Sequence, residues 1–78
     1  MAERETTYVP GDLLQAAAES RAWADVARAH AGVHEAMASQ LEGTARKVAK
    51  ALAAVARDNA EHAVRMAERY EQGAAACR

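Results

Sequence analysis

Apolar residues recur every three or four positions along almost the whole chain, and one break interrupts them near the middle. This spacing places the residues on one stripe of a helix. Before the break the stripe contains Leu13, Ala16, Ser20, Trp23, Ala27, His30, His34, Met37 and Leu41, and after it Ala45, Val48, Leu52, Val55, Asn59, His62, Met66 and Tyr70. The break is Leu41-Glu42-Gly43-Thr44. The pattern predicts an all-α chain in which two long helices form an antiparallel hairpin.

Local signals place the start of this hairpin at Asp12. Pro10-Gly11 interrupts any earlier helix, and the Asp12 carboxylate can accept hydrogen bonds from the N–H groups of a first turn. Residues 1–11 are therefore expected to form a flexible arm, and residues 12–73 to form the helical hairpin.

Two glycines mark the expected ends of the helices. Gly43 suits the position just after the first helix, where φ is positive, and Thr44 suits the N-cap of the second. Gly73 is expected to end the second helix and to leave residues 74–78 as a frayed tail. The alternative is one uninterrupted rod that runs straight through the central glycine.

Alanine dominates the composition, so the helices are easy to form but the core is thin. The chain has 78 residues, of which 51% are hydrophobic and 23 are alanine, the best helix former and a residue that buries little area. Because so small a chain has little core of its own, we expect the hairpin to pair with its own copy or a paralogue as a four-helix bundle. The larger side chains expected in that core and interface are Trp23, Val26, Val33, Met37, Leu41, Leu52, Val55 and Met66. Trp23 is expected to anchor the core or to insert into the partner.

Charge and hydropathy argue against nucleic-acid and membrane partners. The net charge of −1 gives no attraction to phosphate backbones or anionic lipids, and the basic residues Arg46, Lys47 and Lys50 have no aromatic neighbours, which favours a solvated face. No apolar run approaches the roughly 20 residues of a membrane span, and the N-terminus lacks the apolar segment of a classical signal peptide. The expected location is the cytoplasm, or outside the cell by a route that needs no such peptide.

Three histidines on the stripe suggest an alternative, a small metal-binding bundle. His30 and His34 are four residues apart, a spacing that can hold one metal ion on a helix face, and His62 could add a ligand across a dimer. Within one hairpin His62 is expected more than a turn from His30, so histidines at an interface, or sensitive to pH, are the favoured interpretation. No nucleophile with a base and no phosphate-binding glycine loop is present, so we expect no catalysis and no cofactor.

The turn contains Leu41-Glu42-Gly43, and the second helix ends with Tyr70-Glu71-Gln72-Gly73-Ala74. In these places the chain resembles the WXG-type small helical-hairpin proteins of type VII secretion systems in high-GC Gram-positive bacteria, which have Trp-x-Gly at the turn and often a Tyr-x-x-x-Asp/Glu export signal. The resemblance implies a secretion substrate, or an escort of a paralogue or a larger secreted protein, with Tyr70 as the remaining part of the signal. An adaptor or antitoxin-like partner protein is a further alternative.

Overall fold

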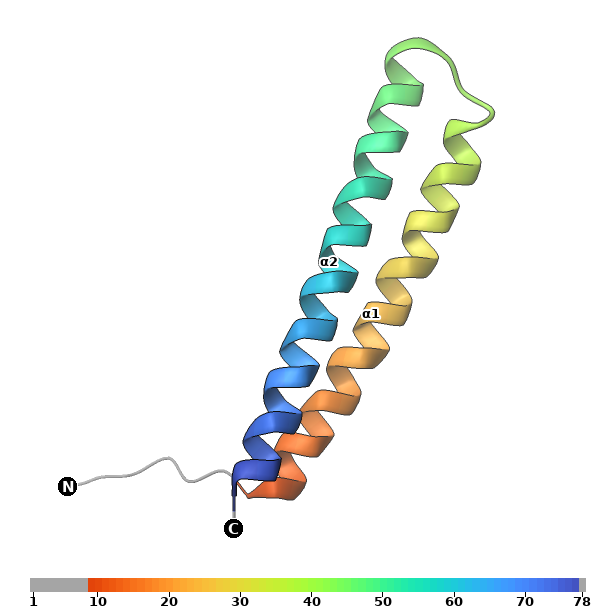
Figure 1. Cartoon of the computed structure of the whole chain (residues 1–78). Coiled ribbons are helices and arrows are strands. Elements are labelled where there is room, and N and C mark those ends of the chain that lie inside the picture. The colour runs from red at the N-terminus through yellow and green to blue at the C-terminus, as the bar shows by residue number, and fades with distance from the viewer. Residues whose placement is uncertain (1–8, 78) are drawn as a thin grey trace, which may run out of the picture.

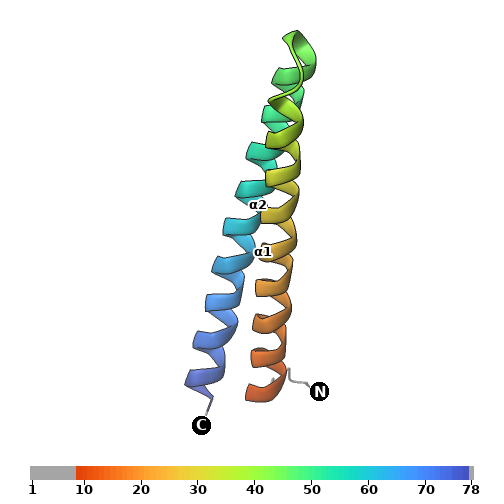
Figure 2. The same cartoon turned by 90° about the vertical axis from the view of Figure 1, so that its right-hand side faces the viewer.

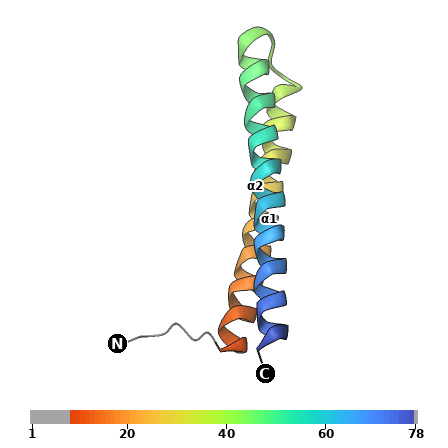
Figure 3. The same ribbon diagram turned by 60° about the vertical axis from the view of Figure 1, so that its left-hand side comes forward.

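The computed structural model describes residues 9–77, and over this range the chain forms two α-helices and no strand. Helix α1 spans Pro10–Ala38 and helix α2 spans Gly43–Ala76. They run in opposite directions side by side, joined at one end by a short connection (Figure 1). Figure 2 and Figure 3 show the same pair from two other directions. The predicted antiparallel hairpin is confirmed, while most of the predicted N-terminal arm lies outside the described residues.

Helix α1 begins at Pro10, two residues before the predicted cap. Proline suits the first turn of a helix because the N–H that it lacks would have no acceptor there. The Val9 carbonyl accepts the backbone N–H groups of Asp12 and Leu13 at 3.0 and 3.3 Å. Asp12 therefore lies inside the first turn, where its charge complements the helix dipole, and the prediction that it caps the helix was wrong.

The chain reverses at residues 39–42, slightly before the predicted turn at Gly43 and Thr44. Gly43 has a φ of 63°, as expected, but it is the first residue of α2 rather than the residue that follows α1. The N-cap of α2 is Glu42, so Thr44 lies within the helix, and its predicted capping role was wrong. The glycine is needed because a side chain at this backbone angle would be strained.

Side chains on both sides of the connection satisfy carbonyl groups at the end of α1. Arg46 Nε donates to the Ala38 carbonyl oxygen at 3.1 Å, and Ser39 Oγ donates to the Ala36 carbonyl oxygen at 2.6 Å. These carbonyls belong to the last turn of α1, where groups have no intrahelical partner. Arg46 thereby ties the start of α2 to the end of α1.

The far end of α2 extends past the glycine that was predicted to end it. Gly73 is helical, and α2 continues to Ala76, so residues 74–76 are not frayed as predicted. A Cβ built on Gly73 would lie 3.5 Å from Leu13 Cδ1, which places the two residues opposite each other. Packing against the start of α1 supports the last turn of α2, since tertiary contacts supply most helical stability in proteins.

The line of contact between the helices consists of alanine. All buried residues in the described part of the chain are alanines, hereafter the alanine seam: Ala17, Ala24, Ala31 and Ala38 on α1, and Ala49, Ala53, Ala56, Ala60, Ala67 and Ala74 on α2. The α1 members recur every seven residues, as in a coiled coil. Such small side chains allow the helix axes to approach toward the lower end of the roughly 8–10 Å range.

The seam lies one residue later than much of the predicted stripe. Trp23 is 68% exposed while Ala24 is 0% exposed, and Leu52 is 45% exposed while Ala53 is 2% exposed. One residue is a rotation of about 100° around a helix, so the large side chains lie beside the contact instead of in it. Of the two expectations for Trp23, the anchor of a core within the hairpin was wrong, and insertion into a partner stays a prediction.

Candidate interaction surface

The larger apolar side chains form a second stripe on each helix. Each of them precedes by one position a buried or partly buried residue. On two antiparallel helices, side chains that come one position before the residues at the contact point to the same side of the pair. The two stripes therefore form one surface, hereafter the apolar face. Its members are Trp23, Val26, His30, Val33 and Met37 on α1, and Val48, Leu52, Val55, Asn59, His62 and Met66 on α2.

A groove on this side shows that both helices contribute to the apolar face. It has a volume of about 200 Å³ and is lined by Trp23, Val26, Ala27, His30, Asn59 and Ala63. No charged side chain lines it. The large residues around it are open to solvent, with Val33 56% and Val55 55% exposed. Large exposed apolar patches are common at interaction sites, which makes the apolar face the candidate interaction surface of this chain.

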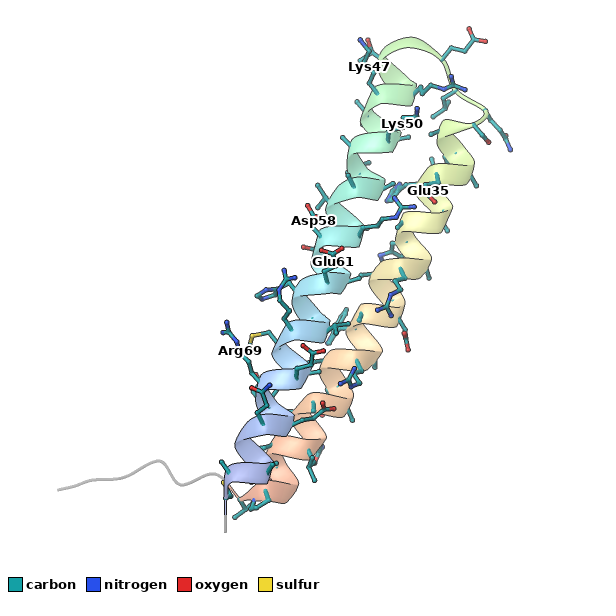
Figure 4. All side chains as sticks on the ribbon, in the orientation of Figure 1. Glu35, Lys47, Lys50, Asp58, Glu61 and Arg69 are labelled. Carbon is teal, nitrogen blue, oxygen red and sulfur yellow. The ribbon has the colours of Figure 1, made fainter. Side chains whose placement is uncertain are left out.

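The opposite side of the hairpin, hereafter the charged face, carries ion pairs between the helices. Arg21 donates through Nε and Nη2 to the two carboxylate oxygens of Glu71 at 3.0 and 2.8 Å, and Arg57 pairs with Glu35. Figure 4 shows Glu35 and Lys50 between the two helices on this side. The charged groups that bridge the helices therefore lie away from the apolar face.

The ion pair between Arg21 and Glu71 shifts the pKa of both side chains. The hydrogen bond from Arg21 lowers the pKa of Glu71 below its ordinary 4.5, against a smaller opposing effect of burial. The same hydrogen bond raises the pKa of Arg21. Both side chains are exposed, so the pair orients the helices more than it stabilises them.

Of the basic residues near the turn, Arg46 is engaged within the hairpin. A cleft of about 460 Å³ is lined by Glu35, Ala38, Ser39, Arg46, Lys50, Ala53 and Arg57. Glu35 offsets the charge of Arg57, and Arg46 donates to the backbone of α1. Arg46, Lys47 and Lys50 are exposed, as expected for a solvated face.

The three histidines fall into two regions. His30 and His62 lie on the apolar face, whereas His34 is partly buried at the contact between the helices. The Nδ1 atom of His34 is buried and has no hydrogen-bond partner among residues 9–77. Over the same range no group of three or more His, Cys, Asp or Glu side chains is placed to hold a metal ion. The predicted pair of His30 and His34 thus gives no assembled site within one hairpin.

The remaining predicted site residues lie at the two ends of the contact. Leu41 is partly buried in the connection, and Tyr70 is partly buried on α2. Ala74, in the place of the acidic signal residue of the WXG-type proteins, is only 8% exposed and belongs to the alanine seam. Val48 belongs to the apolar face and is 52% exposed; it was not among the predicted interface residues, although its spacing of four from Leu52 could have identified it.

No protein-family model, no curated protein and no solved structure matches this chain. In the part of the chain that the structure describes, neither helix has an apolar stretch long enough to cross a membrane.

Proposed function

We propose that this chain is a non-enzymatic helical hairpin that pairs through its apolar face with a second hairpin, its own copy or a paralogue, to form a four-helix bundle. The observation that supports this most strongly is the distribution of side-chain size. The hairpin fills its own contact with alanine and leaves Trp23, Leu52 and Val55 about half exposed or more. Tryptophan is the residue type most enriched among those that dominate binding energy at interfaces.

The two faces together favour a closed pair over an open polymer. Within residues 9–77 one side of the hairpin is mostly apolar, while the other carries the ion pairs of Arg21 with Glu71 and of Arg57 with Glu35. A partner hairpin on the apolar side gives the two-layer packing of a four-helix bundle. The charged faces then point outward on both sides, and no apolar surface of comparable size remains for a third hairpin.

We further propose the escort role that the resemblance to WXG-type proteins implies. The antiparallel hairpin with a positive φ at Gly43 supports it. Tyr70 and Ala74 lie toward α1, and the seam has no room for an acidic group at residue 74 without burying a charge. A chain without its own exposed signal acid suits a partner that accumulates in the cytoplasm and leaves the cell together with a signal-bearing hairpin.

Removal of the Trp23 side chain tests the pairing. Sedimentation equilibrium at micromolar concentration is expected to give about twice the monomer mass of 8.3 kDa for the natural chain, or for its mixture with a paralogue. Trp23→Ala is expected to weaken association by more than tenfold, since central aromatic residues commonly contribute about 2 kcal/mol or more. The emission of Trp23, the only tryptophan, reports its burial in the same titration.

Leu14→Ala is the matched control. Leu14 is 52% exposed but lies one position after Leu13, which puts it on the side of the charged face. Its truncation removes as much apolar surface as many face residues offer and is expected to leave the mass unchanged. An equal loss of association in both variants, or none in Trp23→Ala, would contradict pairing through the apolar face. Added EDTA is expected to change neither result.

A further inference from the structure

Two charged residues of opposite sign continue the stripes of the apolar face toward the open end of the hairpin. Glu19 precedes Trp23 by four residues on α1, and Arg69 follows Met66 by three on α2. Figure 4 places Arg69 on the outer side of α2, away from α1. Glu19 accepts a hydrogen bond from Gln15 at 3.3 Å, and no ion pair joins it to Arg69 within the described residues. The two charges thus border the same face on opposite helices without meeting.

The level of these charges along the hairpin follows from the contact of Leu13 with Gly73. Counting from that contact, the residue opposite Glu19 is two positions from Arg69, which is less than one turn. Trp23 and Met66 lie at similar levels by the same count. The face is therefore layered: aliphatic toward the turn, polar at its middle with His30 and Asn59, mixed next with Trp23, His62 and Met66, and charged toward the open end.

A second groove lies beside Glu19. It has a volume of about 200 Å³ and is lined by Glu19, Ala22, Trp23 and Val26. Its walls are almost wholly apolar apart from the carboxylate at its edge. An arginine fits such a groove because its aliphatic stem packs on apolar walls while the guanidinium reaches the carboxylate and the indole face.

We infer that the apolar face binds a second copy of this chain in parallel orientation, so that both turns lie at the same end of the dimer. Arg69 of each copy then lies in the groove beside Glu19 of the other copy. This inference rests on the proposed pairing. A two-fold axis along the hairpin places α1 of one copy over α2 of the other. Each layer then meets a compatible one: aliphatic residues meet aliphatic residues, His30 meets Asn59, Trp23 meets Met66 with His62 beside it, and Glu19 meets the opposite charge of Arg69.

The antiparallel arrangement of two copies lacks this complementarity. An axis across the middle of the face places α1 over α1, which brings Glu19 onto the apolar level of Met37 and Arg69 onto that of Val48. Burial of a charge against apolar side chains without a partner is unfavourable. Asp12, which is exposed in the first turn of α1, lies toward the open end, where it stays in water in either arrangement.

Exchange of the two charges tests the arrangement. Glu19→Arg or Arg69→Glu alone creates two like-charge contacts per dimer, and each is expected to weaken self-association at least tenfold at low salt. The double variant Glu19→Arg/Arg69→Glu is expected to recover affinity to within about threefold of the natural chain. An equimolar mixture of the two single variants is expected to form a heterodimer, because one supplies only positive and the other only negative charges at these sites.

Arg65→Glu is the control, since Arg65 is exposed on the same helix one turn earlier and lines neither groove; it is expected to leave the association unchanged. Spin labels on Cys77, the only cysteine, report orientation in the natural dimer. Parallel copies place the labels at one end, within about 30 Å, whereas antiparallel copies separate them by about 50 Å, the length of α2 at 1.5 Å per residue.

The outcomes separate this inference from the proposed function. Suppose that Trp23→Ala disrupts the dimer, but that the double variant does not recover the affinity lost in the single variants or that the labels lie about 50 Å apart. Either result overturns the parallel arrangement and leaves the proposed pairing intact. A natural chain that stays monomeric alone but binds a paralogous hairpin through the same face overturns the second copy as occupant. A chain that pairs with neither contradicts both.

Discussion

The alanine seam and the apolar face share the same helices and the same spacing, yet they differ in the size of their side chains and in their exposure. At the seam a methyl group is sufficient, and Ala24 and Ala67 are fully buried. On the face, one residue earlier, Trp23 is 68% exposed. The two helices have placed their smallest side chains where they meet and their largest where they do not.

This difference shows that hydrophobicity alone does not decide which stripe of a helix becomes the interior. Larger side chains bury more apolar area, and on that ground alone Trp23, Leu52 and Met66 would face the partner helix. Alanines allow a closer approach of the backbones and continuous contact along both helices. The larger residues then remain exposed on the apolar face, where they are available for the proposed second layer.

The largest expected effect comes from enlarging the seam. Ala24→Leu places three extra carbon atoms at a site with 0% exposure, and such overpacking commonly costs about 1–3 kcal/mol. The free energy of unfolding from urea titration, followed by circular dichroism at 222 nm, measures this loss. The Trp23→Ala background is used so that association does not contribute to the stability.

Ala29→Leu is the control for this substitution. Ala29 is exposed and lies away from both the seam and the apolar face, and alanine and leucine have similar helix propensities. We expect a change within about 0.5 kcal/mol, as for most surface substitutions. A loss of stability in Ala29→Leu equal to that in Ala24→Leu would remove the distinction between seam and surface.

The hairpin could be predicted from the sequence because its signals are local and agree with one another. Spacing of three and four residues indicates helices, and Gly43 is the one position near the middle that permits a positive φ. These features depend on the chain itself and not on what packs against it. The start at Pro10 was misread because proline is compatible with the first turn of a helix as well as with a break before it.

The orientation of the helices could not be predicted in the same way. Two stripes one residue apart both show the three-four period, so periodicity cannot choose between Ala24 and Trp23. The choice depends on the fit of two helices along their whole length, a tertiary property. The same limit explains Gly73, whose contact with Leu13 supports a turn of helix that the glycine alone disfavours, and it left Arg69 and the groove of Glu19 out of the predicted site.

A smaller effect on stability is expected from substituting the histidines at the alanine seam and on the apolar face. His34 lies at the seam with a buried Nδ1 that lacks a hydrogen bond within the described residues, and an unsatisfied buried group costs about 1–3 kcal/mol. His34→Leu is therefore expected to raise the stability of the hairpin by about 1 kcal/mol. Thermal unfolding of the Trp23→Ala background measures it.

His30→Leu is the matched substitution on the apolar face. His30 is exposed in the single hairpin, so the same change is expected to leave the free energy of unfolding of the hairpin almost unaltered. It is expected to change the affinity of association instead, because the layer that His30 forms with Asn59 loses one polar group. Polar groups in such layers set register at some expense of stability. If His30→Leu stabilised the monomer as much as His34→Leu, the two regions would not differ in burial as the structure has them.

The smallest effect belongs to the charged face and has a defined direction with pH. The hydrogen bond from Arg21 lowers the pKa of Glu71 in the folded chain, so the unfolded chain binds its proton more readily. The pair therefore stabilises the fold above the ordinary carboxyl pKa of 4.5, and this stabilisation is lost as the pH falls through the lower folded value.

In the Trp23→Ala background, Glu71→Gln is expected to lower the melting temperature slightly at pH 7 and to make no difference in strong acid. Arg21→Gln is expected to show the same small loss, and the double variant no further loss, because both remove one interaction. If the melting temperature of the Glu71→Gln variant differed from that of its parent by the same amount at pH 7 and in strong acid, the ion pair of Arg21 with Glu71 would contribute nothing to the stability of the fold.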